Sequence, residues 1–259
     1  MKLDLYQVDA FANGPFSGNP AAVCPLENWL SDELMQNIAQ ENNLAETAFF
    51  VKEKNGFHIR WFTPTKEVNL CGHATLASAS VLFEQLNYSD DVIYFQSKSG
   101  LLRVRRADNL LQLDFPSQVA IHCDTPSAIT EAFGKAPLAC LKNEDYVVVY
   151  EDEDFIKSVE PNLALLETLD LRGVIITSQS EEYDFVNRVF APKYGINEDP
   201  VTGSAFTKLI PYWAEKLNTE TLKAKQVSKR GGEVNCELAN DRVLISGTCT
   251  LYMIGKIYI

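Results

Sequence analysis

Three side chains in the first third of the chain have the chemistry to move a proton. Glu46 stands in the apolar run LAETAFFV, His73 follows Gly72 at the start of a predicted helix, and Cys71 precedes that glycine. If Glu46 is buried, loss of hydration favours its protonated form and suits it to general acid–base catalysis. Strand alternation could equally point it to solvent. His73 is the one histidine of three at a turn expected to face a ligand, where it could donate a hydrogen bond or relay a proton.

A related segment occurs about half a chain length later. RWFTPTKEVNLCGHAT, from Arg60 to Thr75, resembles RVFAPKYGINEDPVTGSA, from Arg188 to Ala205. After a short insertion, Gly72-His73-Ala74 corresponds to Gly203-Ser204-Ala205, so both copies enter a helix through a glycine. Two halves built alike predict two equivalent loops that face each other as the walls of one active site.

The two predicted helix starts suit the binding of an anion. A helix N-terminus offers unpaired N–H groups and the positive end of the helix dipole. We therefore expect the amides of Gly72, Gly203 and Ser204 to hold a carboxylate. The glycines could instead serve tight turns and close helix packing, although their repetition weighs against that interpretation. Asp199, just before the second helix, could cap the helix or direct a charge at the site.

Cys71 raises the alternative of a cysteine racemase, which needs a base on each face of one carbon. The equivalent place in the second copy lies near Asp199-Pro200 and holds no cysteine. A two-thiol racemase is therefore disfavoured, while Cys71 paired with a different second base stays open. A ligand-binding or interaction protein without catalysis is a further alternative, which tight binding without solvent-deuterium incorporation would distinguish.

The elements that must position these residues recur in each half. Alternating and apolar runs predict several strands around one buried helix, at 72–86 in the first half and 203–217 in the second. Pro211 is expected to kink the second helix. The fold class is α+β, with mostly antiparallel sheets. We expect domains at 1–117 and 118–249, and the last strand, about 250–259, could return to the first.

Composition excludes several classes of function. The net charge of −12 and the absence of a concentrated basic patch argue against a nucleic-acid partner. No apolar run reaches the about 18 residues of a membrane span. The six cysteines show neither CxxC nor a zinc-ligand spacing, which favours a cytoplasmic protein with reduced thiols and no metal. Nucleotide, serine-hydrolase and zinc-protease motifs are also absent.

Five motifs carry a resemblance over nearly the whole chain. The chain resembles the PhzF-like proteins of phenazine biosynthesis, which belong with the diaminopimelate-epimerase-like proteins. The motifs are, in order, DAFANGPFSGNPAAVC (9–24), NLAETAFF (43–50), RWFTPTKEVNLCGHAT (60–75), EDPVTGSA (198–205) and QVSKRGG (226–232). The resemblance implies two pseudo-symmetric domains, each a sheet rolled around a central helix, with the site in the cleft between them. It also implies a cofactor-independent isomerase and a possible homodimer.

The resemblance assigns roles to individual residues. In the phenazine enzyme the motif glutamate moves a proton on a cyclohexadiene acid, and that role falls here on Glu46. His73 and Asp199 take the other catalytic positions, while the substrate-binding positions fall on Gly72, Gly203 and Ser204. Asn69 and Phe206 depart from the family pattern and could reshape the pocket. We therefore expect an isomerase that shifts a proton on a small carboxylated substrate, without a cofactor.

Overall fold

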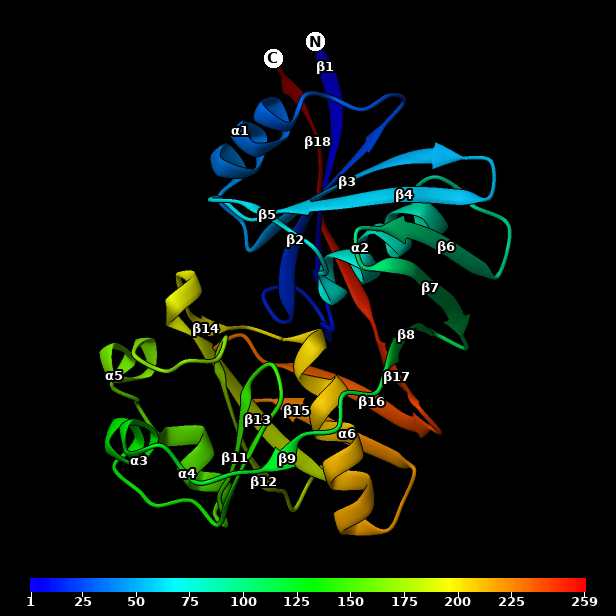
Figure 1. Ribbon diagram of the computed structural model, residues 1–259. Coiled ribbons are helices and arrows are strands. Elements are labelled where there is room, and N and C mark those ends of the chain that lie inside the picture. Colours follow the sequence, from blue (N-terminus) through cyan, green and yellow to red (C-terminus); the bar gives the residue numbers. More distant parts are fainter. The chain divides into compact units, whose positions relative to one another are not determined.

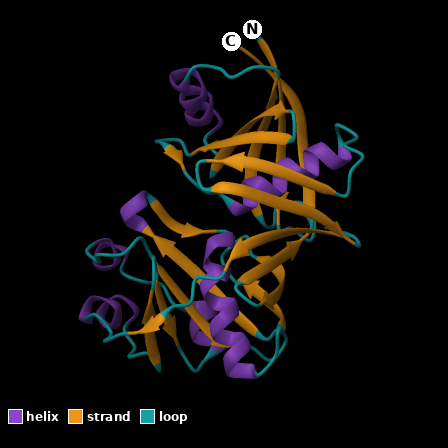
Figure 2. Cartoon of the chain, turned by 45° about the vertical axis from the view of Figure 1, so that its right-hand side comes forward, coloured by secondary structure: helices purple, strands orange, loops and turns teal.

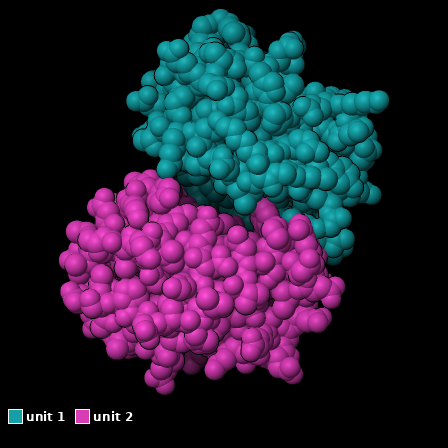
Figure 3. Space-filling view, in the orientation of Figure 1, with its two compact units in different colours: residues 1–114, 246–259 teal, residues 115–245 magenta.

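The computed structural model describes residues 1–259, and the chain forms two compact units. Unit 1 consists of residues 1–114 and 246–259, and unit 2 of residues 115–245; Figure 3 colours them separately. The chain leaves unit 1 within strand β8 (Leu110–Pro116) and returns to it within β17 (Arg242–Gly247). The domain boundaries predicted from the sequence lie after residues 117 and 249.

Unit 1 is a mostly antiparallel sheet, in which the β2–β3 and β4–β6 pairs are parallel. Besides β8, its elements are β1 (Lys2–Ala10), β2 (Asn19–Leu26), α1 (Asp32–Asn42), β3 (Glu46–Glu53), β4 (Gly56–Phe62), β5 (Glu67–Val68), α2 (Gly72–Glu84), β6 (Val92–Ser97), β7 (Gly100–Ala107) and β18 (Cys249–Tyr258). The last strand pairs along the first, so the two termini lie together (Figure 1).

Helix α2 is the centre of unit 1, and strands surround it in Figure 2. Eleven of its thirteen residues are buried, including those on the side that would face water in a surface helix. Small residues permit this close packing. Two hydroxyl groups of the helix donate hydrogen bonds to backbone carbonyls one turn earlier. Thr75 donates to the Cys71 carbonyl at 2.5 Å and Ser78 to the Ala74 carbonyl at 2.7 Å. A helix without a polar face can therefore be enclosed.

Unit 2 repeats the order and the pairing of unit 1. Strands β10 to β17 pair as β1 to β8 do, with parallel contacts at the equivalent β11–β12 and β13–β15 pairs. Besides β17, its elements are β9 (Ile121–His122), α3 (Ser127–Phe133), β10 (Ala139–Lys142), β11 (Tyr146–Val149), α4 (Glu153–Ser158), α5 (Leu163–Glu167), β12 (Val174–Gln179), β13 (Phe185–Ala191), the 3-10 turn η1 (Pro192–Tyr194), β14 (Ile196–Asp199), α6 (Gly203–Leu217), β15 (Thr221–Gln226) and β16 (Gly232–Ala239). The fold is α+β with two pseudo-symmetric halves.

The repeated sequence motif has a structural basis in each unit. Arg60 on β4 pairs through two nitrogens with Glu67 on β5, at 2.8 and 2.9 Å. Arg188 on β13 pairs in the same way with Glu198 on β14, at 2.6 and 3.1 Å. Each bidentate ion pair ties the strand to the short strand that leads into the central helix. The two arginines aligned in the sequence therefore make the same contact in the two halves.

Pro211 lies inside α6, which runs unbroken from Gly203 to Leu217. A proline in a helix leaves the carbonyl four residues earlier without its usual donor. Here the backbone N–H of Gln118 donates to that carbonyl, on Thr207, at 3.0 Å. The segment before β9 thus supplies the hydrogen bond that Pro211 cannot donate to the Thr207 carbonyl, and the helix stays continuous.

Candidate active site

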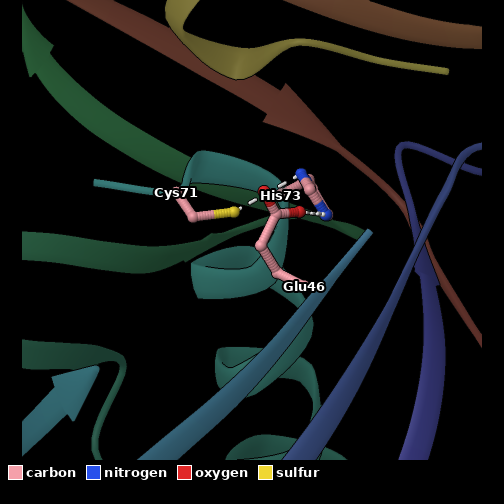
Figure 4. A group of neighbouring side chains, drawn as sticks. All are labelled: Glu46, Cys71 and His73. Atoms are coloured by element: carbon pink, nitrogen blue, oxygen red, sulfur yellow. Dashed lines mark hydrogen bonds and ion pairs between the residues drawn. The ribbon is translucent and has the colours of Figure 1, made fainter. Parts of the chain in front are cut away.

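Glu46, Cys71 and His73 come together in unit 1, at the start of α2 (Figure 4). Glu46 is the first residue of β3, where five consecutive residues are buried, so neither face of the strand is open to water there. Cys71 is the N-cap residue of α2 and makes no side-chain capping bond. The start of α2 therefore keeps its first N–H groups without a side-chain cap, beside three titratable groups.

Glu46 and His73 form the closest polar contact of the site. His73 Nε2 lies 3.0 Å from Glu46 Oε2, and the residues are only 4 % and 9 % exposed. The distance is that of an ion pair, but neither atom has a well-directed hydrogen-bond partner. Buried polar atoms are rarely left so, and at a functional site the missing partner is often a ligand. The pair is therefore a candidate for contact with a substrate.

The other ring nitrogen of His73 faces two further side chains. Nδ1 lies 3.2 Å from Asn19 Nδ2 and 3.5 Å from Cys71 Sγ. A neutral imidazole would accept from the Asn19 amide nitrogen, whereas a charged one requires that amide to turn its oxygen inward. Either arrangement fixes the plane of the ring with Nε2 towards Glu46.

Charge and burial set the protonation of this group. Burial alone lowers the pKa of His73, but its interactions with Cys71 and Glu46 outweigh burial and raise the pKa well above 6.5. Burial, and then the Glu46 charge, raise the pKa of Cys71 to about 11. The Cys71 thiol therefore stays protonated near neutral pH. Cys71 is a poor base in this environment.

The same trio could also accommodate a cation. One donor atom from each of Glu46, Cys71 and His73 lies within 4.8 Å of the others. Thiolate, imidazole and carboxylate are zinc ligands, and three of them leave one position for substrate or water. Binding would require Cys71 to lose the proton that its surroundings favour.

The start of α6, in unit 2, has different surroundings. Thr202 Oγ1 donates to Asp199 Oδ2 at 2.5 Å, and Gln226 fixes the loop by donating to the Asp199 carbonyl at 2.7 Å and accepting from the Thr202 N–H at 2.9 Å. Asp199 therefore binds the side chain of Thr202, the N-cap residue of α6. The loop is held rigidly by the first residue of the QVSKRGG motif.

Arg172 was not expected from the sequence and lies beside this helix start. It donates to Ser204 Oγ at 3.0 Å and to both oxygens of Asp145, at 2.7 and 2.6 Å. Lys208, one turn further along α6, is fully buried, with Nζ 3.2 Å from Asp145 and 2.9 Å from Gln118 Oε1. Burial lowers the pKa of Lys208 despite the Asp145 charge. Since Ser204 Oγ accepts from Arg172, its own proton is free to be donated to a ligand.

The structure thus groups the expected residues by unit. Glu46, Gly72 and His73 lie together in unit 1; Asp199, Gly203 and Ser204 lie together in unit 2. Asn19 and Arg172 also contact these residues, and neither was predicted from the sequence. Asn19 belongs to the DAFANGPFSGNPAAVC motif, where the sequence alone gave no sign that its side chain is directed at His73. Arg172 has no local signal, since it reaches Ser204 from a distant part of the chain.

Comparison with known proteins assigns this two-unit α+β protein to a family. The model of the phenazine biosynthesis-like protein family matches residues 8–255. An uncharacterised isomerase of Pseudomonas aeruginosa is 50 % identical over 259 residues and all of both chains, and one of Halalkalibacterium halodurans is 46 % identical over 252 residues and 95 % of both. The chain belongs to the phenazine biosynthesis-like, or PhzF-like, family.

Solved structures agree with this assignment. A PhzF-family protein of Enterococcus faecalis matches with a TM-score of 0.98 and 46 % identity over the whole of both chains. A hydroxyproline epimerase of Agrobacterium vitis shares the fold, with a TM-score of 0.66 and 11 % identity over 99 % of this chain and 92 % of that one. The two bacterial relatives named as isomerases support an isomerase at the general level. No helix has the length and apolar character that a membrane crossing requires.

Proposed function

We propose that this protein is a cofactor-independent isomerase that shifts a proton on a small carboxylated substrate. The observation that carries the proposal is the buried Glu46–His73 pair, 3.0 Å apart, with two polar atoms that lack a well-directed partner. Nothing else in unit 1 combines burial, a basic oxygen and a proton donor beside the unblocked start of a buried helix. General acid–base catalysis needs this combination.

In the proposed reaction, Glu46 Oε2 removes a proton from a carbon next to, or conjugated with, the substrate carboxylate. The electron pair left on carbon spreads onto that carboxylate, where hydrogen-bond donors stabilise it. The His73 N–H and the Gly72 amide are the donors in unit 1. Glu46 then returns the proton to a different carbon, so the enzyme ends as it began. His73, whose pKa is raised, holds a proton beside Glu46 throughout the cycle.

The second copy of the motif is proposed to bind the substrate. Asp199 orients it and assists proton transfer, and the amides of Gly203 and Ser204 bind an anionic group. The support is the sequence repeat together with the Arg172 contact, which leaves the Ser204 proton available. The six free thiols favour a reducing, cytoplasmic compartment, and a homodimer is proposed by resemblance to the family.

The test is deuterium uptake in heavy water by a panel of small carboxylic acids, including cyclohexadiene acids and amino acids. Uptake by the wild type that disappears in Glu46→Gln supports the proposal and identifies the substrate class. Tight binding without uptake would instead favour a ligand-binding protein. A racemase that uses Cys71, whose sulfur contacts His73, would be revealed by substrate-protected inactivation with a thiol-alkylating reagent.

A further inference from the structure

Two cysteines outside the candidate site have their sulfur atoms in contact. Cys123 Sγ lies 3.7 Å from Cys140 Sγ, within unit 2. Both thiols are free, with Cys123 half-buried and Cys140 buried. β9 and β10 run antiparallel with His122 opposite Leu141, and the Cys123 N–H donates to the Cys140 carbonyl at 3.0 Å. The two cysteines are therefore opposed neighbours, next in register along this strand pair.

This arrangement is compatible with a covalent bridge. Opposed residues at a hydrogen-bonded position of an antiparallel pair have Cα atoms about 5.5 Å apart. That separation falls inside the range of about 4.4–6.8 Å found in disulfides. The sulfurs would have to approach from 3.7 Å to about 2 Å, through side-chain rotation and a small backbone shift. β9 is only two residues long, so a shift there disturbs few ladder hydrogen bonds.

We propose that Cys123 and Cys140 form a reversible thiol–disulfide site for low-molecular-weight disulfides of the glutathione class. The Cys123 thiolate attacks the small disulfide, breaks its S–S bond and releases one small thiol, leaving a mixed disulfide. The Cys140 sulfur then attacks Cys123 Sγ and releases the second small thiol. Two protein thiols are oxidised, one small disulfide is reduced to two thiols, and the cysteine protons pass to the released thiolates.

The surroundings assign this order to the two cysteines. Cys123 is the more exposed and is the one that a reagent in solution can reach. Burial, and then the neighbouring Cys123, raise the pKa of Cys140 to about 12. A buried thiol with a raised pKa reacts slowly with a dilute reagent. The mixed disulfide on Cys123 would form next to Cys140, however, and this proximity would make the second step fast.

The bridge would constrain one edge of unit 2. It closes a loop over 124–139 that contains α3, and Cys140 packs in the same apolar cluster as Ile129 and Phe133 of that helix. Residues adjacent to the bridge, among them His122 and Leu141, line a cavity of about 1130 Å³ beside the second half of α6. Oxidation should therefore raise the unfolding temperature of the protein and stiffen this cavity wall.

The experiment treats the reduced full-length protein with oxidised glutathione under native conditions and follows intact mass and peptide maps. The wild type should lose two hydrogen atoms, with the bridge mapped to Cys123 and Cys140, and dithiothreitol should reverse the change. Cys140→Ser should instead retain one glutathionyl group on Cys123, because the second step is blocked. Cys236→Ser, which removes another buried thiol of unit 2, should behave as the wild type.

Three results would overturn the proposal. One is a glutathionyl group that persists on Cys123 of the native wild type. Another is a bridge that forms only in denaturant. The third is an unchanged loss of two hydrogens in Cys123→Ser, which would show that other cysteines react. Thermal unfolding of each variant beforehand establishes that it is folded, and Cys123→Ser, at the more exposed position, is the substitution least able to disturb the core.

Discussion

Helices α2 and α6 begin at equivalent places in the repeat, yet the side chains around the two starts differ in kind. At α2 stand Glu46, Cys71 and His73, all titratable, and two of their polar atoms have no well-directed partner. At α6 the polar side chains partner one another, with Asp199 bonded to Thr202 and Ser204 bonded to Arg172. One copy of the motif therefore suits proton transfer, and the other suits rigid recognition.

The proposed function divides a duplicated element between two tasks. In each copy an Arg–Glu pair holds the hairpin, and a glycine opens the central helix. The residue after that glycine differs between the copies, since His73 can carry a proton whereas Ser204 can only donate a hydrogen bond. Substitutions in the two copies should accordingly affect different steps of the reaction.

The largest effect is expected for Glu46→Gln. The amide keeps the shape of the side chain but cannot accept a proton from carbon, so the turnover rate should fall by about 10³-fold or more. The change is measured as the rate of deuterium exchange at saturating substrate. Asp199→Asn, in the second copy, should lose less, because Asp199 is proposed only to orient the substrate and to assist the transfer. An equal loss in both variants would contradict the division of roles.

His73→Asn should reduce turnover by about 10²-fold, because it removes a proton donor and the partner of Glu46. Its distinguishing readout is the pH profile. Without the positive charge that His73 carries, the acid limb of the pH–rate curve should move to higher pH. A variant with lowered turnover but an unmoved acid limb would show that His73 acts only through packing.

Ser204→Ala is expected to raise KM about 10-fold and to leave kcat nearly unchanged, because the hydroxyl contributes to binding. Arg172→Lys tests the same contact from the other side, since lysine keeps the charge but cannot bridge both Asp145 and Ser204 in a fork. Its effect should also fall on KM. A fall in kcat alone for Ser204→Ala would place Ser204 in the chemical step.

The raised pKa of His73 predicts a pH-dependent stability. A group whose pKa is higher in the folded state stabilises it fully below the unfolded value of about 6.5, and the stabilisation is lost as pH rises through the folded value. The free energy of unfolding should therefore decline as pH rises above about 6.5, and His73→Asn should flatten that decline. His58→Asn, at a half-exposed histidine beside Glu53, is the control and should retain it.

Cys71→Ser should have the smallest effect on turnover, within about threefold, since the thiol stays protonated and is not the proposed base. The rate of deuterium exchange checks this. A loss comparable to that of Glu46→Gln would revive the racemase in which Cys71 is one of two bases.

Much of the fold could be predicted from local pattern, and particular parts could not. The repeated segments at 60–75 and 188–205 predicted two similar halves, and the apolar runs after Gly72 and Gly203 predicted α2 and α6. The helix over 203–217 was predicted to its end residues, while the predicted 72–86 extends two residues past α2. Short elements, such as the two-residue strand β9 and helix α4, were missed because they are too short to show a period.

The sequence indicated which residues belong to the candidate site, but not which way their side chains point or which residues they contact. Alternation could not decide where Glu46 points, because β3 is covered on both faces at its start. The contact between Asn19 and His73 depends on β2 lying beside β3, with Ala21 opposite Glu46. Likewise, the contact of Arg172 with Ser204 depends on tertiary packing. Such contacts have no signal in sequence spacing.

The most direct test of the account compares one substitution from each copy of the motif. Deuterium exchange into the substrate would be measured against substrate concentration for Glu46→Gln and Ser204→Ala. We predict that Glu46→Gln lowers kcat by about 10³-fold or more and that Ser204→Ala keeps kcat while raising KM. Retention of kcat by Glu46→Gln would contradict the central claim that this carboxylate moves the proton.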